Sequence, residues 1–146
     1  MQADKATKTE VLQTLNGLFD AYKKRDLKGM LAYMANDPDV VVIGSGEDER
    51  SIGPSQFGKS ASRDWAQSES ASVSIPDAVV SSAGSVAWFA ADVTFQFTIE
   101  GKESNLPGRL TGVLEKRGGQ WLLMQLHFST PACEQEHGHS WPEEAQ

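Results

Sequence analysis

The sequence predicts a single α+β domain in which three helices from the first half cover one face of an antiparallel sheet built by the second half. Two observations support this prediction. Before residue 70, apolar residues recur at three- and four-residue spacing, which is typical of amphipathic helices. After residue 70, β-branched and aromatic residues alternate with smaller or polar ones in runs that end at glycine-containing turns, which is typical of a strand meander.

Three segments carry the helical pattern. The first helix is expected over residues 9–24, and a second, shorter helix is expected to begin at Asp26 and to stop before Pro38. The third is expected to open at Pro54, because proline is favoured in the first turn of a helix. The buried stripe of this third helix is expected to comprise Phe57, Ala61 and Trp65.

The strand pattern begins with the β-branched run "DVVVIGSG", followed by a charged turn and a short returning strand. Glycine-containing turns then separate a series of longer strands. These four strands are expected near residues 71–81, 85–99, 106–117 and 120–129.

Composition narrows the function classes. The chain has 146 residues and a formal net charge of −7, which argues against binding to a nucleic-acid backbone or to an anionic membrane. It holds one cysteine, and we find neither a signal-peptide apolar region nor a run of about 20 apolar residues that could span a membrane. We therefore expect a cytoplasmic protein.

Two polar segments offer metal-ligand donors. Cys133, His137 and His139 suit zinc, but they lie in a segment without periodicity and without a second ligand pair. The acidic run of residues 47–49 could collect a cation, or it could be a solvated turn, which we favour. We expect no metal and no cofactor.

The element order and two stretches, "RDLKGMLAYMANDPDVVVIGSG" and "VLEKRGGQWLLMQLHFST", resemble the nuclear transport factor two-like superfamily. The similarity is greatest to its SnoaL-like branch and to the association domain of calmodulin-dependent protein kinase II. It covers about residues 9–131, so we expect one SnoaL-like domain over residues 1–131 and a flexible polar tail over 132–146. The resemblance implies a cone-shaped, curved antiparallel sheet wrapped around the helices, with an apolar pocket inside.

Strand alternation then assigns side chains to the two sheet faces. Matching the kinase association domain places the set containing Trp88, Ala90 and Asp92 in the pocket. A bulge would exchange the faces beyond it, and the assignment is least secure near Phe95. The residues expected to bind a ligand are Tyr33, Trp65, Trp88, Asp92, Leu110, Met124, Leu126 and Phe128.

The opposite face is also apolar, and the helices can cover only one face of the sheet. We therefore expect a homodimer in which a second copy covers the outer face. The residues expected in this contact include Phe89, Gln125 and His127. In this alignment His127 faces away from the pocket, and we interpret it as a structural residue rather than a catalytic one.

For an enzymatic function, the sequence offers Asp92 as a candidate catalytic residue. Asp92 is a single acid in an otherwise apolar strand, so it is either a general base with a raised pKa or a partner of Arg109. The resemblance extends to ketosteroid isomerases, which use a strand aspartate as base and form an oxyanion hole from a helix tyrosine and a protonated aspartate. The matching positions here are Leu18 for the tyrosine, Val42 or Ile43 for the base, and Thr111 or Gly112 for the second acid, and none of these residues is titratable. That reaction is therefore not supported.

Three functions stay open at this point. The first is binding of a small hydrophobic molecule in an apolar pocket, with or without an unassigned reaction. The second is an oligomerisation or scaffold module. The third is a cyclase, dehydratase or isomerase-like enzyme that uses Asp92.

Overall fold

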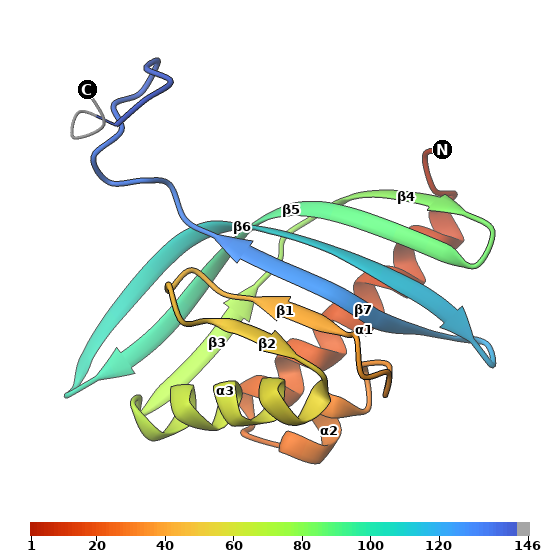
Figure 1. Ribbon diagram of the computed structural model, residues 1–146, viewed down its shortest axis with the longest axis horizontal. Helices are drawn as coiled ribbons and strands as arrows, with labels where there is room; N and C mark the ends of the chain where they lie inside the picture. The colour runs from red at the N-terminus through yellow and green to blue at the C-terminus, as the bar shows by residue number, and fades with distance from the viewer. Residues whose placement is uncertain (143–146) are drawn as a thin grey trace.

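Three helices lie on one side of a curved, unclosed sheet in the computed structural model, which describes residues 1–142 (Figure 1). This arrangement confirms the predicted α+β fold class. Helix α1 spans Lys5–Lys23, α2 spans Leu27–Leu31 and α3 spans Pro54–Ala66. The first helix begins earlier than expected, because the Asp4 carboxylate accepts a hydrogen bond from the Thr7 backbone N–H at 2.7 Å and so caps it.

The second helix confirms its predicted start. The Asp26 carboxylate accepts from the Gly29 backbone N–H at 2.9 Å. The helix ends at Leu31, earlier than the sequence predicted, and the following residues join the sheet instead. There the Leu123 N–H donates to the Tyr33 carbonyl and the Ala35 N–H donates to the Leu123 carbonyl, each at 2.9 Å.

Within residues 1–142, seven strands form the sheet, one more than predicted. The expected strand over residues 71–81 is divided by Pro76, which has no N–H to donate to a ladder. Its two parts pair with different stretches of the same long strand, Val86–Ile99. The strands are β1 (Val41–Ile43), β2 (Arg50–Ile52), β3 (Ser70–Ser74), β4 (Val79–Ala83), β5 (Val86–Ile99), β6 (Lys102–Arg117) and β7 (Gln120–Ser129).

The strand order is β2-β1-β7-β6-β5-β3, with β4 pairing the other end of β5. Strands β5, β6 and β7 form the antiparallel meander that the sequence predicts. The expectation of a wholly antiparallel sheet is wrong, however, because β1 runs parallel to β7. The sheet is therefore mixed, and β1 and β2 extend it over the helices (Figure 1).

A bulge interrupts the pairing of β6 with β7. Val113 lies opposite Gln125, whereas the next residue, Leu114, lies opposite Leu123, so Met124 is the extra residue. As a result, Leu123 and Leu126 are both buried on the inner face although they are three residues apart. The face assignment from the sequence was least secure near Phe95, where a bulge would exchange the two faces. The structure has no bulge there, because β5 pairs with β6 in an unbroken register.

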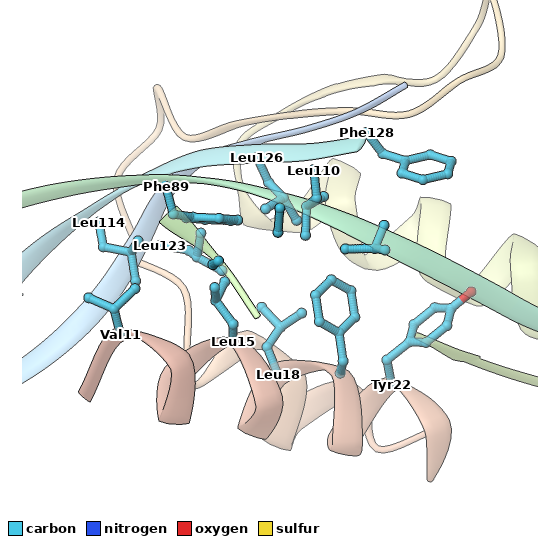
Figure 2. Packing of buried hydrophobic residues seen from close by; sticks show 14 of the residues in the cluster. Val11, Leu15, Leu18, Tyr22, Phe89, Leu110, Leu114, Leu123, Leu126 and Phe128 are labelled. Carbon is cyan, nitrogen blue, oxygen red and sulfur yellow. The ribbon is translucent and has the colours of Figure 1, made fainter. Parts of the chain in front are cut away.

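The core lies between α1 and the inner face of the sheet. Val11, Leu15 and Leu18 from α1 point toward Leu114 and Leu123 from the sheet, and all five are 0–1% exposed (Figure 2). The two layers spread apart toward the C-terminal end of α1 (Figure 2). This divergence leaves room for the pocket described below.

The predicted face assignment of β5 is wrong. Leu110, correctly expected inside, lies opposite Ala91 in the register of β5 and β6. The inner set therefore contains Phe89 and Ala91, whereas Trp88 and Asp92 lie on the outer face. A shift of one residue in register exchanges the two faces of a strand, which accounts for the error.

Residues 130–142 leave the end of β7 and run away from the sheet (Figure 1). They include Cys133, His137 and His139, which are exposed. The last four residues of the expected tail, 143–146, lie outside the described part. None of the helices in residues 1–142 is long and apolar enough to cross a membrane.

Candidate functional site

A pocket of about 360 Å³ opens between the C-terminal half of α1, helix α3 and the inner face of the sheet. Its walls are mainly hydrocarbon and aromatic, because the inner-face residues of β5, β6 and β7 point into it. Side chains that form these walls are Phe57, Phe95, Phe97, Leu110, Leu126 and Phe128. Such a cavity suits a small, largely hydrophobic ligand.

A hydrogen-bonded pair of side chains is among the polar groups in this mainly apolar lining. The Tyr22 hydroxyl, from the last turns of α1, donates to Oδ2 of Asp64, from the last turn of α3, at 2.9 Å. Both residues line the pocket, and the Tyr22 ring also packs edge-on against Phe95 at 6.4 Å between centroids. The pair therefore joins the two helices and presents a hydrogen-bonded carboxyl group to the cavity.

Burial disfavours the charged form of both groups. It raises the pKa of the Asp64 carboxyl above its ordinary value, and the nearby charge of Glu49 raises it further. The hydrogen bond from Tyr22 and the charge of Arg63 oppose this rise only in part. Burial and the Asp64 charge raise the pKa of the Tyr22 hydroxyl, so it remains a proton donor in the hydrogen bond.

The acidic run of residues 47–49 borders the same pocket. Glu49 lines it, but both of its carboxylate oxygens have partners: Oε1 accepts from Arg63 at 3.3 Å and Oε2 from the Gly46 N–H at 2.8 Å. Arg63 also pairs with Asp48 at 2.7 Å. This loop is therefore an ion-paired turn, and among residues 1–142 no three Asp, Glu, His or Cys side chains lie close enough to hold a metal ion.

The sequence profile of the SnoaL-like domain matches residues 11–133, which is most of the chain and includes every element that forms the pocket. The protein belongs to the SnoaL-like domain family. No curated protein matches the sequence.

Solved structures share this fold with the SnoaL-like domain. A nuclear transport factor 2-like protein of Salmonella enterica serovar Typhimurium superposes with a TM-score of 0.82 at 18% identity, covering 95% of this chain and 100% of its own. A protein of Xanthomonas campestris described as a candidate calcium/calmodulin-dependent protein kinase II association domain gives 0.73 at 24%, covering 83% and 85%. A protein of Streptomyces avermitilis described as a candidate dehydratase of the same family gives 0.78 at 16%, covering 88% and 98%.

Several residues that the sequence proposed as ligand contacts lie at the pocket or beside it. Leu110, Leu126 and Phe128 line the pocket of the SnoaL-like domain. Trp65 lies behind it, where its indole N–H donates to the Tyr22 carbonyl at 3.1 Å and its ring packs on Tyr22. Tyr33 packs its ring against Gly17 on α1 and does not line the cavity.

The other proposed contacts lie elsewhere. Trp88 is half-buried and Asp92 exposed on the outer sheet face, and Met124 is the bulged residue of β7, which packs against the small cluster around Met34 and Val40. Asp92 faces Arg109 across the strands, but the Arg109 guanidinium donates to Ser129 Oγ and to the Thr130 carbonyl, each at 3.3 Å. The outer position of Asp92 removes the physical reason for assigning it a role in the pocket.

Of the residues expected on the outer face, Gln125 and His127 are exposed there, so His127 faces away from the pocket as predicted. The expectation for Phe89 is wrong. It is 3% exposed and packs in the core, with its ring against Gly112 on the neighbouring strand.

The sequence reasoning missed Tyr22 and Asp64. It placed Tyr22 within the first helix, expected over residues 9–24, without a role in the site, and it did not single out Asp64. A signal was present, because Asp64 lies seven residues after Phe57 and three after Ala61, and so on the same face of α3. Leu18, matched by resemblance to a catalytic tyrosine, does line the pocket, and Tyr22 lies one helical turn beyond it.

Proposed function

We propose that this SnoaL-like domain binds a small, largely hydrophobic molecule in the pocket between α1, α3 and the sheet. The observation that supports this most directly is the cavity of about 360 Å³ with aromatic and aliphatic walls. A pocket of this size lies within the range of small-molecule sites. Burial of a ligand's apolar surface against these walls supplies affinity, at about 25 cal/mol per Å² before the costs of association.

The direct test uses prodan, a neutral dye that becomes brighter in apolar surroundings. Ala71 is 7% exposed and lines the pocket from β3, so Ala71→Trp places a large ring inside the cavity. Ala90 is exposed on the outer face of β5, so Ala90→Trp adds the same ring outside it. We expect saturable dye binding by the wild type and by Ala90→Trp, and its loss in Ala71→Trp.

Overpacking could also unfold the Ala71→Trp variant, so circular dichroism and a second variant accompany it. Ser60→Trp introduces the ring from α3 at a half-buried position of the pocket wall. Dye binding that persists in folded forms of both pocket variants would contradict the proposal. Native mass spectrometry of gently purified wild type should also show a bound mass that the two variants lack.

A second candidate function is acid–base catalysis centred on Asp64 rather than Asp92. The observation that favours it is the Tyr22–Asp64 hydrogen bond inside the pocket, with the pKa of Asp64 raised by burial. A carboxylate with a raised pKa is a stronger base than an ordinary aspartate. The molecule recovered from the pocket serves as the substrate: Asp64→Asn should abolish its conversion and Asp92→Asn should not, whereas unchanged turnover by Asp64→Asn would reject this function.

We also propose that a second copy of the chain covers the outer sheet face. That face exposes Val79, which is 74% exposed, beside the half-buried Trp88. Asp92 and Arg109 lie opposite each other on the same face, so a two-fold arrangement can bring each near the partner's opposite charge. Sedimentation at micromolar concentration should give a dimer. A monomer would contradict the proposal, and a larger closed ring would favour the scaffold alternative.

A further inference from the structure

We propose that the ligand of this pocket carries a positively charged nitrogen, so that the site selects small hydrophobic amines over neutral and anionic molecules of the same shape. The ammonium group would bind the Asp64 carboxylate while the hydrocarbon part fills the aromatic cavity. This inference rests on the proposed binding function and adds the chemical class of the ligand to it.

The charges of the pocket support this class. Its lining includes two carboxylates, Glu49 and Asp64, and no lysine, arginine or histidine among the described residues. The nearest guanidinium groups are already engaged: Arg63 pairs with Asp48 and Glu49, and Arg25 donates to the carbonyls of Trp65 and Ser68 at 2.8 and 2.7 Å. A ligand inside the cavity therefore meets negative side chains and no free positive one.

Asp64 is the carboxylate that remains available. Its Oδ2 accepts from Tyr22, whereas Oδ1 accepts a hydrogen bond from none of the residues 1–142. Glu49 differs, because both of its oxygens are occupied by Arg63 and Gly46. An ammonium group bound at Oδ1 would gain a charge-assisted hydrogen bond and would offset the cost of keeping this carboxylate partly buried.

The aromatic walls add to the same preference. Phe95 and Phe128 pack together at 4.6 Å between ring centroids, and Tyr22 adjoins Phe95, so several rings surround the space beside Asp64. The face of an aromatic ring attracts a cation within about 6 Å. An anionic ligand would instead meet these faces and the like charge of Asp64, which disfavour its binding, whereas Glu49 is already paired with Arg63.

Three probes of matched shape test the inference: 1-naphthylmethylamine, 1-naphthylmethanol and 1-naphthoate, titrated calorimetrically into the wild-type protein at pH 7. We expect the amine to bind about tenfold or more tightly than the alcohol, because a hydrogen bond to a charged group is worth more than a neutral one. The anion should bind more weakly than both. Asp64→Asn should reduce amine affinity to the level of the alcohol and leave alcohol affinity within about twofold.

Asp39→Asn is the matched control, because Asp39 is an exposed carboxylate before β1 that does not line the pocket and should not affect any of the three affinities. Glu49→Gln measures how much the second carboxylate contributes. A pH series on the wild type needs no substitution. Amine affinity should fall as acid protonates Asp64, whose charged and titratable neighbours are Tyr22, Glu49 and Arg63, with Arg25 beside Tyr22, while alcohol affinity should stay level.

The outcomes separate this inference from the function on which it rests. Equal binding of amine and alcohol, or tightest binding of the anion, would overturn the amine preference and leave the hydrophobic pocket standing. Amine affinity that Asp64→Asn does not change would also overturn it. If none of the probes binds the wild-type protein, the proposed binding function fails as well.

Discussion

The two faces of the β5–β6–β7 sheet differ in what their side chains meet. On the inner face, Leu110 and Leu114 are 0–1% exposed and pack toward α1 or line the pocket. On the outer face, Asp92, Thr111 and His127 are exposed. Although both faces are built from the same strands, one is a packed core with a cavity at its end and the other is a surface.

This difference shows what determines which face of a strand is buried when the alternation of its side chains does not. Both residue sets of β5 contain large apolar side chains, Trp88 on one face and Phe89 on the other. The neighbouring strand resolves the ambiguity, because Arg109 lies opposite Asp92 and Gly112 lies opposite Phe89. A pair of charges suits the solvent face, and a glycine beside a phenylalanine ring suits the core.

The largest expected effect comes from truncating the inner face. Leu123→Ala removes a fully buried side chain and should lower the free energy of unfolding by about 2–5 kcal/mol. Gln125→Ala, two residues along the same strand and exposed, should change it by less than about 0.5 kcal/mol. Urea denaturation of both variants measures the contrast, and similar losses would contradict the assignment of the two faces.

Much of the fold could be predicted because its signals are local. The stripe of α1, the cap at Asp26 and the proline that opens α3 depend on residues within a few positions of one another. The bulge at Met124 could not be predicted, because it depends on how β7 pairs with β6 along one edge and with β1 and Met34 along the other. No short stretch of sequence contains that information.

In the candidate site, too, the contacts between segments far apart in the sequence could not be predicted. Leu110, Leu126 and Phe128 could be placed in the pocket because strand alternation groups them and the resemblance to the kinase association domain selects their face. The Tyr22–Asp64 pair joins residues 42 positions apart and exists only because α1 and α3 end side by side. Helical spacing can put Asp64 on the inward face of α3, but the tyrosine opposite it is known only from the packing of the two helices.

Adding a methyl group to the inner face should have an intermediate effect. A Cβ on Gly112 would lie 2.6 Å from the Gln125 carbonyl oxygen and 2.8 Å from the Phe89 ring. Gly112→Ala should therefore cost about 1–3 kcal/mol of stability, since the backbone atom cannot move aside cheaply. Thr111→Ala, at the exposed neighbouring position, is the control and should cost less than about 0.5 kcal/mol. A neutral result for Gly112→Ala would show that β6 and β7 are less closely packed than the structure indicates.

The smallest expected effect is a pH-dependent difference between a partly buried carboxylate, that of Asp64 on α3, and an exposed one. Burial raises the folded-state pKa of Asp64 above its ordinary value of 3.8, so the folded protein holds this proton more tightly than the unfolded chain does. Asp64 therefore lowers stability as the pH rises through the interval between the two pKa values, and this loss is absent below 3.8.

Asp64→Asn, which cannot ionise, should be more stable relative to the wild type at pH 7 than at pH 3.5. Asp39→Asn provides the comparison, because Asp39 is exposed and its substitution should change stability little at either pH. Urea denaturation of the three proteins at both pH values measures the difference, and an Asp64→Asn variant whose relative stability falls between pH 3.5 and pH 7 would show that the Tyr22 hydrogen bond outweighs the burial of the carboxylate.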